Sequence, residues 1–524
     1  MKRLLSTALA AATATAGVVI PSAFPAGAVL DGTMPAANAA PASSSGSTTP
    51  PHVKVESDPK PSQIIPIPPN QQTQSGLRYE GPMAGAPLGG ASIRQSDTAF
   101  YHESRDLSAF KPGDILGQRT ISYHALGLQF PVSVVQIRYR TTDAQGRPSV
   151  GVTSVVKPTG KPNGRLVSYH SVYDSLNPEH SPSRAIEGDF ALGTFSSGME
   201  TAVLIPYLAQ GYSVAIPDIE GQTADFAAGP EYGQITLDGI RAALNSKKLR
   251  LGTKAKVGLL GYSGGAIATN WAAQLAPQYA PDINDNFVGA ATGGTLVNPI
   301  HDVKYINGSP LWAGVLPMAV VGLARAYDLD LDPYLSPYGK RIMTKLRNAS
   351  LFEVHAQFGG VTYESMFRPE YKDPRSVPGL VDVLNKVNMN LGPNPDVPFM
   401  IGQTNGGFMD GTMPGPKGIG KGDGVMVTGD VRSIADKYCK AGNPVLYREY
   451  EILPHTSAFA LWYPEATTWL MDRFNGRPAP SSCGHIPRGN SLEALTPVKP
   501  APHNPKAPQP QPGGVAGIRD QLNI

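Results

Sequence analysis

Apolar and polar positions along the chain predict strands that alternate with helices. Two runs rich in β-branched residues, 133–140 and 149–156, flank the turn-forming stretch DAQGRP and predict an antiparallel hairpin. After the hairpin, short apolar runs typical of buried strands alternate with amphipathic stretches typical of helices. The strands are expected at 165–171, 212–218 and 256–263, and the helices at 236–248 and 266–277. This alternation predicts an α/β fold with a mostly parallel central sheet and helices on both faces.

The periodicity changes between residues 299 and 395, where helical stretches follow one another with few strand runs between them. About a hundred residues is too long for a single crossover between parallel strands, so we expect an inserted helical cap rather than ordinary sheet-covering helices. Strands resume at 397–403 and 444–453, and a helix at 457–474 closes the domain. The core around this cap is expected in two parts, 97–298 and 396–484.

The first residues predict export. Lys2 and Arg3 precede an apolar run that ends at Ile20, and the small residues at 26–28 offer a cleavage site. This arrangement predicts that residues 1–28 are a secretory signal peptide. An uncleaved membrane anchor is the alternative, but the run is rich in Ala and Thr and at the short end for a spanning helix. No later stretch has the length and apolarity to cross a bilayer, so we expect a secreted or cell-envelope protein.

Composition sets the remaining boundaries and excludes some functions. Residues 29–96 are dominated by Pro, Ser and Ala, and residues 485–524 are rich in Pro, so we expect a disordered spacer and a disordered tail. With 16% charged residues and a formal net charge of +3, the chain has no strong electrostatic preference for nucleic acid. Cys439 and Cys483 could pair in an oxidising compartment, or could be two unpaired small core residues.

The central feature for function is Gly261-Tyr262-Ser263-Gly264-Gly265, which lies between a predicted strand and a predicted helix. A nucleophile at such a sharp turn needs small neighbours, because side chains at Gly261 or Gly265 would collide with the adjoining backbone. The turn would hold the Ser263 hydroxyl above the sheet edge, and the helix N-terminus would stabilise negative charge. A Gly-rich turn with a capping serine gives the same letters, but the position between strand and helix favours a nucleophile.

A serine nucleophile needs a histidine that takes its proton and a carboxylate that orients the histidine, here in the chain order Ser, acid, His. His455 directly follows the last predicted strand, where the base is expected. The other histidines after Ser263 fall in the predicted cap or near the C-terminal tail: His301, His355, His485 and His503. We therefore predict that His455 is the base.

Three aspartates between the strand at 397–403 and the next helix compete for the role of the acid. We favour Asp423, because the flanking glycines would let the loop bend its carboxylate toward the histidine ring. Asp410 is the rival, and Asp430 is better placed to cap the following helix.

The oxyanion of the reaction requires two backbone N–H donors, and one should come from Gly264, the residue after the nucleophile. The other should come from the loop after the strand at 165–171, where Asp174 is the candidate. An aspartate that simply closes a turn is the alternative for Asp174.

Nucleotide and metal chemistry are not predicted. The stretch GPKGIGK at 415–421 imitates a phosphate-binding loop, but Gly422 stands where Ser or Thr would bind magnesium. The motif HExxH is absent from the sequence, and His, Cys and acidic residues do not cluster at metal-ligand spacing. We expect no metal, no cofactor, no nucleic-acid partner, and a monomer.

These residues and several further blocks in the same order resemble the secretory lipase family of fungi and actinobacteria. The likeness runs from about residue 100 to residue 483. Its blocks are PGDIL (112–116), YDSL (173–176), GYSVAIPDIEG (211–221), TLDGIRAA (236–243), GYSGGA (261–266), GDGVMV (422–427) and DRFNGRPAPSSC (472–483).

The resemblance implies an α/β-hydrolase fold with a helical cap, acting on acylglycerols and other carboxylic esters. It assigns the nucleophile to Ser263, the base to His455, the acid to Asp423, and the oxyanion donors to Asp174 and Gly264. It is also consistent with a disulfide between the two cysteines. The stretch before Asp423 is longer than the family's usual connection, which leaves Asp410 open as the acid.

The predicted function is therefore hydrolysis of carboxylic esters, above all acylglycerols, through an acyl-enzyme, with transient contact with a lipid interface. The apolar stretch 311–323 would suit a long acyl chain, and equally the core of the cap itself. Two alternatives stay open: an acyltransferase that delivers the acyl group to a sugar or lipid hydroxyl, and a catalytically degenerate fold that binds the cell envelope.

Overall fold

The computed structural model describes residues 98–522, all of which belong to the compact unit 56–524. The predicted signal peptide 1–28 and spacer 29–96 lie outside the described residues.

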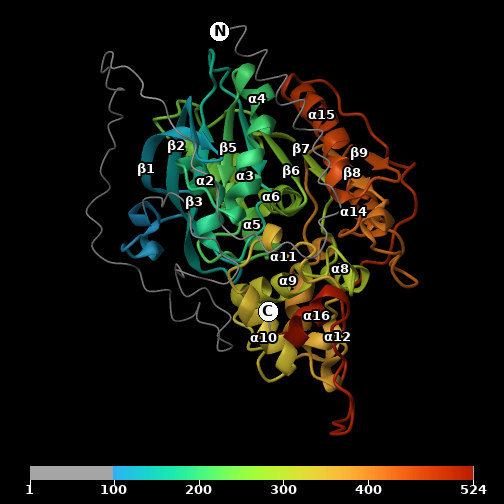
Figure 1. The fold of residues 1–524 in the computed structure, drawn as a ribbon. Helices are drawn as coiled ribbons and strands as arrows, with labels where there is room; N and C mark the ends of the chain where they lie inside the picture. The colour runs from blue at the N-terminus through green and yellow to red at the C-terminus, as the bar shows by residue number, and fades with distance from the viewer. Residues whose placement is uncertain (1–97, 523–524) are drawn as a thin grey trace, which may run out of the picture. The chain divides into compact units, whose positions relative to one another are not determined.

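A nine-stranded sheet in the order β1-β2-β3-β5-β4-β6-β7-β8-β9 forms the centre (Figure 1). The strands are β1 (Ile115–Ala125), β2 (Leu128–Thr142), β3 (Pro148–Val156), β4 (Leu166–His170), β5 (Ser213–Pro217), β6 (Val257–Tyr262), β7 (Phe287–Gly293), β8 (Phe399–Thr404) and β9 (Val445–Tyr450). The first three strands pair antiparallel, β3 pairs antiparallel with β5, and all pairs from β5 to β9 are parallel. The predicted hairpin and mostly parallel sheet are confirmed.

Strand β1 is missing from the prediction because its burial follows no period of two. Its residues mix half-buried polar and buried apolar side chains, since it lies at the sheet edge beside β2. Alternation is the main signal for a strand in a sequence. An edge strand without it is therefore hidden among loops.

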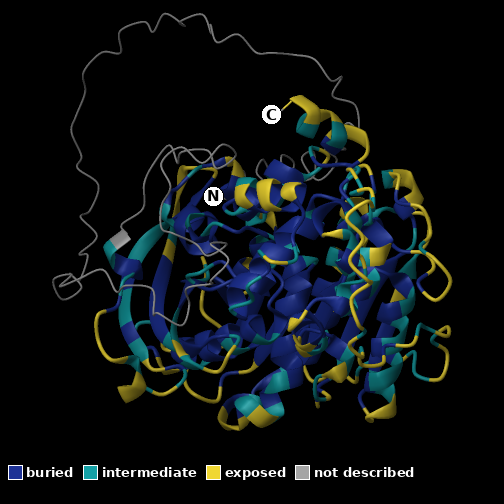
Figure 2. Cartoon of the chain, turned by 90° about the horizontal axis from the view of Figure 1, so that it is seen from below, coloured by how far each residue is buried: buried dark blue, intermediate teal, exposed yellow. Residues whose placement is uncertain are grey.

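Helices cover both faces of the sheet, as predicted. One face packs against α5 (Gly229–Asn245), α6 (Gly264–Tyr279) and α14 (Thr428–Lys440), and the other against α4 (Thr201–Ala209) and α15 (His455–Phe474). Val134 and Val135 are neighbours in β2 but belong to cores on opposite faces, because successive strand side chains point in opposite directions. Figure 2 shows buried residues along the sheet and its flanking helices.

Shorter helices complete the structure. Before β6 these are α2 (Pro182–Glu187) and α3 (Phe195–Met199), and before β7 α7 (Pro281–Asn284). Between β7 and β8 lie α8 (Pro299–Ile306), α9 (Val315–Ala326), α10 (Pro337–Leu346), α11 (Leu351–Val354), α12 (Tyr363–Met366) and α13 (Leu380–Lys386). The chain ends with α16 (Gly514–Leu522).

The segment 299–391, called the helical insertion below, has a hydrophobic core of its own. Helix α10 illustrates why it is helical: Pro337 begins the helix and the Ser336 hydroxyl accepts a hydrogen bond from the Gly339 N–H at 2.9 Å. Its buried side chains, among them Ile342 and Leu346, join those of α9 and α12 in one cluster. Figure 1 shows these helices together beyond one end of the sheet.

The C-terminal segment, residues 485–522, was expected to be disordered but packs against the rest of the fold. Leu492 is buried in the core beneath α14, and Ala516 of α16 is buried in the core of the helical insertion. Backbone N–H groups of this segment donate to carbonyls of the insertion. The N–H of Val498 donates to Arg375 at 3.1 Å, and that of Ala516 donates to Gly359 at 2.9 Å. Composition suggested disorder because the segment has few apolar residues, but an extended Pro-rich chain can pair along a surface that already exists.

The disulfide joins Cys439 at the end of α14 to Cys483, with the two Cα atoms 5.5 Å apart. It ties the start of the C-terminal segment to the core. Within residues 98–522, no helix combines the length and the apolarity needed to cross a bilayer.

Candidate active site

The turn that carries Ser263 is built from glycines that leave no room for a side chain. Ser263 follows β6 directly and has φ of 52° and ψ of −121°, a backbone conformation that residues other than glycine rarely adopt. A Cβ atom at Gly261 would lie 2.2 Å from the carbonyl oxygen of Gly265. A Cβ atom at Gly265 would lie 2.0 Å from the carbonyl oxygen of His170 on β4. The close approach of β4, β6 and α6 therefore explains both glycines.

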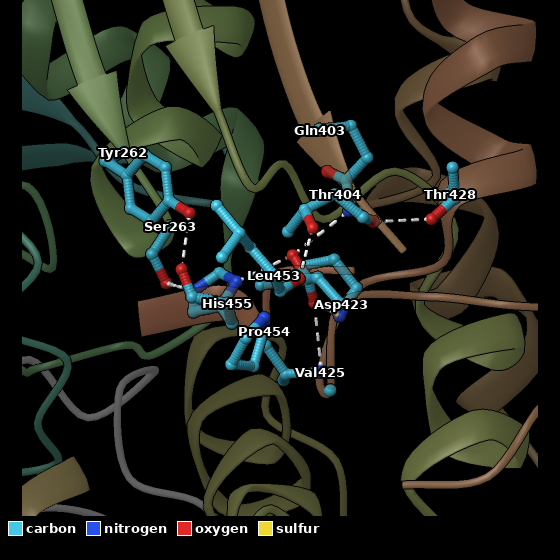
Figure 3. A network of polar contacts seen from close by, with 12 residues as sticks. Tyr262, Ser263, Gln403, Thr404, Asp423, Val425, Thr428, Leu453, Pro454 and His455 are labelled. Carbon is cyan, nitrogen blue, oxygen red and sulfur yellow. Dashed lines mark hydrogen bonds and ion pairs between the residues drawn. The ribbon is translucent and has the colours of Figure 1, made fainter. Parts of the chain in front are cut away.

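Ser263, His455 and Asp423 lie in one line of hydrogen bonds (Figure 3). The Ser263 Oγ lies 2.8 Å from Nε2 of His455, and Nδ1 of the same ring lies 2.7 Å from Oδ2 of Asp423. Ser263 directly follows β6, Asp423 lies in the loop after β8, and His455 follows the loop after β9. Parallel strands bring their carboxyl ends to one sheet edge, which is how residues so distant in sequence meet.

Asp423 is held by a tight turn and by a side chain from β8. Its Oδ1 accepts the backbone N–H groups of Val425 at 3.0 Å and Met426 at 2.7 Å. Its Oδ2 accepts Nε2 of Gln403 at 3.0 Å in addition to the histidine. With Asp423 fully buried, these donors fix the direction of the carboxylate.

His455 is the first residue of α15 and is fixed at both its backbone and its ring. Its N–H donates to the carbonyl of Asp423 at 2.7 Å, and its carbonyl accepts the Tyr262 hydroxyl at 2.6 Å. The ring packs against the rings of Tyr262 and Trp312, with centroids 5.2 and 5.5 Å away. Burial lowers the pKa of His455, but the charge and hydrogen bond of Asp423, together with the charges of Asp410 and Asp174, outweigh burial, so the pKa lies above its ordinary value.

The two other candidate acids lie elsewhere. Asp410 accepts Nε1 of Trp312 at 3.1 Å and, within the described residues, forms no hydrogen bond with His455, whose Nδ1 bonds Asp423. Asp430 was expected to cap the helix that follows it, but α14 begins at Thr428 without a side-chain cap. Its carboxylate instead lies 2.9 Å from Nδ1 of His301.

The remaining histidines lie away from the serine. His355 packs on the far side of the Trp312 ring, at a centroid distance of 4.7 Å. His503 contacts the Glu370 carboxylate on the helical insertion. His485 lies exposed just after the disulfide. Within residues 98–522, none of the three forms a hydrogen bond with Ser263, whose Oγ bonds His455 instead.

The loop that contains Asp174 packs against the start of α6. Asp174 has φ of 29°, and its Oδ1 would lie 1.8 Å from a Cβ atom at Gly264. Buried carboxylates hold the loop on either side, because the N–H of Val172 donates to Glu200 at 2.8 Å and that of Ser175 to Glu220 at 3.1 Å. Burial raises the pKa of Asp174 to about 7, against an opposing effect of His455.

A largely apolar cavity opens beside Ser263 and runs into the helical insertion. It holds about 980 Å³ of space, its open mouth included. Ser263, Gly264 and Asp174 form its polar end. Its apolar wall includes Phe226, Ile267, Leu296, Ile300, Leu316 and Val320. Such a cavity suits a substrate with a long apolar part.

Three residues around the site could not be found from the sequence. Gln403 ends a buried strand, where a polar residue is a weak sign of function. Trp312 lies in an apolar stretch of the insertion that predicts a core position. Glu200 lies in the turn between α3 and α4, in no recognisable motif. Their roles depend on contacts across twenty or more residues of chain, for which spacing gives no signal.

The fold and the serine turn define an α/β hydrolase. Within residues 98–522, no group of three or more His, Cys, Asp or Glu side chains is placed to hold a metal ion.

Comparisons with known proteins narrow this class. The family model described as Secretory lipase matches residues 187–403. Lipase 1 of Candida albicans is 30% identical over 401 residues, which cover 73% of this chain and 81% of that protein. A probable inactive lipase of Mycobacterium tuberculosis is 30% identical over 391 residues, with 73% and 83% covered.

Solved structures agree. The closed state of Candida antarctica lipase A superposes with a TM-score of 0.64 at 25% identity, covering 76% of this chain and 90% of that one. A rice cell wall degrading esterase of Xanthomonas oryzae shares the fold with a TM-score of 0.51 at 16% identity, over 70% of this chain and 98% of that one. The chain belongs to the secretory lipase family and is a carboxylic ester hydrolase of the lipase type.

Proposed function

We propose that the protein hydrolyses acylglycerols through an acyl-enzyme on Ser263, with His455 as general base and Asp423 as the acid that orients it. One observation carries the proposal: the 2.8 Å and 2.7 Å contacts that connect the serine hydroxyl, the imidazole and the buried carboxylate in series. A serine hydroxyl is a weak nucleophile without such a base. The relative named as a probable inactive lipase makes a direct test of this arrangement worthwhile.

The reaction follows from the geometry. Nε2 of His455 takes the Ser263 proton while Oγ bonds to the ester carbonyl carbon, and the carbonyl oxygen becomes an oxyanion. The tetrahedral intermediate collapses, the bond to the alcohol oxygen breaks, and His455 gives its proton to the leaving alcohol. Water then attacks the acyl-enzyme by the same steps, which releases the fatty acid and restores the serine.

We infer that the backbone N–H groups of Gly264 and Asp174 bind the oxyanion. Gly264 is the first residue of α6, and the N–H groups of a first helical turn have no acceptor within the helix. The contact of the Asp174 side chain with Gly264 brings the two backbones together, and Glu200 and Glu220 hold the loop beneath. Fixed donors of this kind stabilise charge that develops only in the transition state.

The cavity supports a long acyl chain as the substrate's apolar part. Each buried CH₂ group contributes about 0.8 kcal/mol, so kcat/KM is expected to rise by up to about fourfold per carbon until the cavity is full. The test is a series of p-nitrophenyl esters of increasing chain length, measured on the wild type and on Ser263→Ala. We expect at least a ~10⁴-fold loss in Ser263→Ala. Turnover that survives the substitution would remove Ser263 from the reaction.

We also infer that the protein contacts lipid surfaces through exposed apolar residues near the site. Phe408, Met409 and Met413 are 53%, 59% and 67% exposed on the loop after β8. The same loop reaches the site, because Asp410 bonds Trp312. Changing the three residues to serine should weaken binding to vesicles of ether-linked lipid, which cannot be hydrolysed. Leu128→Ser, a change of a leucine that is 67% exposed at the start of β2, is the control.

Secretion and the division of the chain are proposals as well. We infer that residues 1–28 are removed on export, that 29–96 is a spacer, and that 299–395 is a cap between core parts 97–298 and 396–484. The basic start, apolar run and small residues support the first of these. Mass spectrometry of the protein in the medium should give an N-terminus close to residue 29. A cell-bound protein that keeps Met1 would contradict export with cleavage.

A further inference from the structure

Two polar side chains interrupt the apolar wall of the Ser263 cavity away from the serine. Asp302 on α8 and Tyr363 on α12 both line the cavity and are only 6% and 3% exposed. Within the described chain, the two carboxyl oxygens of Asp302 and the hydroxyl of Tyr363 have no hydrogen-bond partner. The proposed reaction uses neither residue.

Buried polar groups without a partner are rare because each one costs free energy. Both side chains are buried at the cavity wall, so bulk solvent does not offset this cost. The Tyr363 ring is stacked on the Phe367 ring at a centroid distance of 4.3 Å, and the backbone N–H of Tyr363 donates to Oδ1 of Asn307 at 2.8 Å. Asp302 lies in the first half of α8, whose neighbouring residues Ile300 and Val303 also line the cavity. The two groups are therefore fixed where a ligand would meet them.

Asp302 can act as a hydrogen-bond donor as well as an acceptor. Burial raises the pKa of its carboxyl group well above the ordinary value, and the negative charges of Asp430 and Asp423 raise it further. The nearby N–H of Val427 opposes this shift without forming a hydrogen bond of normal geometry. A carboxylic acid kept neutral by its surroundings donates its proton in a hydrogen bond.

We propose that the cavity is built for an acyl chain that carries a hydroxyl group, which Asp302 and Tyr363 bind. This rests on the proposed function, because it takes the cavity as the acyl site. An alcohol hydroxyl both donates and accepts, and so do a neutral carboxyl group and a tyrosine hydroxyl. A plain alkyl chain would leave both protein groups unpaired, whereas an anionic chain end would be buried without a counter-charge. The hydroxylated chain satisfies the cavity's apolar wall and its two polar groups together.

The test compares p-nitrophenyl esters of one chain length, either plain or with a single hydroxyl moved along the chain. In the wild type, kcat/KM for the best hydroxylated ester should exceed that of the plain ester at least ~10-fold, since sites built to bond a hydroxyl discriminate against its loss. Tyr363→Phe removes one oxygen atom, and Asp302→Leu removes the carboxyl group. Each variant should lower this ratio, and the double variant should bring it to about one or below.

Tyr207→Phe is the matched control, because the Tyr207 hydroxyl is also buried without a partner but lies on α4, away from the cavity. It should leave the ratio unchanged. The readout is a ratio within one preparation, so partial loss of folded protein does not alter it. A wild type that prefers plain esters at every hydroxyl position overturns the proposal, and so does a preference that survives both variants. Failure of the wild type to cleave any ester would instead contradict the proposed function.

Discussion

The substitution Asp423→Asn removes a charge beside His455 and keeps almost all of the shape. Oδ1 of Asp423 accepts two backbone N–H groups, so the amide oxygen of the new side chain should occupy that position. Its NH₂ group then faces Nδ1 of His455 and Nε2 of Gln403, where Oδ2 now accepts both. To accept from that NH₂ group, the ring must carry its proton on Nε2. In this tautomer Nε2 cannot take the proton of Ser263.

The size of the effect has two parts. A unit charge pair about 4 Å apart interacts by about 4 kcal/mol at an effective dielectric constant near 20, and this attraction stabilises the imidazolium that forms in the transition state. The wrong tautomer adds to that loss. Asp-to-Asn changes in triads of this geometry lower kcat by about 10⁴-fold, which equals roughly 5.5 kcal/mol. We expect a loss of this order.

The assay is kcat for a soluble short-chain ester, measured across pH. Without the charge that raises the pKa of His455, the rise of activity with pH should begin at lower pH in Asp423→Asn. Asp410→Asn is the control, because its amide oxygen can still accept from Trp312, and it should cost less than ~10-fold. A loss in Asp410→Asn that matches Asp423→Asn, or a loss below ~10-fold in Asp423→Asn, would refute the assignment of the acid.

Three further predictions concern the oxyanion loop and stability. Gly264→Ala places a Cβ atom 1.8 Å from Asp174, so the loop must move and kcat should fall by about 10²-fold at steady KM. Burial raises the folded-state pKa of Asp174 and Glu200 from 3.8 and 4.5 to about 7. Their protonated forms therefore stabilise the fold below pH ~4, and this contribution is lost as the pH rises to about 7. The unfolding temperature should fall over that pH range, and it should fall less in Glu200→Gln. Serine at both Cys439 and Cys483 opens a 44-residue separation, and denaturant unfolding should show a loss of about 4 kcal/mol.

The sequence allowed the core of the fold to be predicted, and it named Ser263, His455 and Asp423 as triad candidates, with Asp410 left open as the acid. Ser263 could be found because it directly follows the buried strand β6, and His455 because it lies in the short connection between β9 and α15. Asp423 and Asp410 both follow β8 in a Gly-rich stretch, and the glycines that flank Asp423 favoured it without excluding Asp410. The separation comes from Trp312 and Gln403, which reach the two carboxylates from distant parts of the chain.

The C-terminal segment shows the limit of composition as a guide. Its many prolines and few apolar residues are typical of disorder, yet Leu492 and Ala516 are buried and its backbone pairs with the helical insertion. The surface it covers is formed by α14 and by residues of the helical insertion more than a hundred positions earlier. Composition describes what a segment can bury by itself, and this segment buries its residues against a core that others have built.

The most direct test of the central claim is covalent labelling by a fluorophosphonate, followed by mass spectrometry of the peptide that carries the adduct. The account predicts one adduct per chain, on Ser263, with labelling that is lost in Ser263→Ala and slowed strongly in His455→Ala. Labelling should also slow as pH falls below the pKa of His455, since the ring must be neutral to take the serine proton. An adduct on another residue, or a wild type that takes no label under conditions where it cleaves esters, would contradict the account.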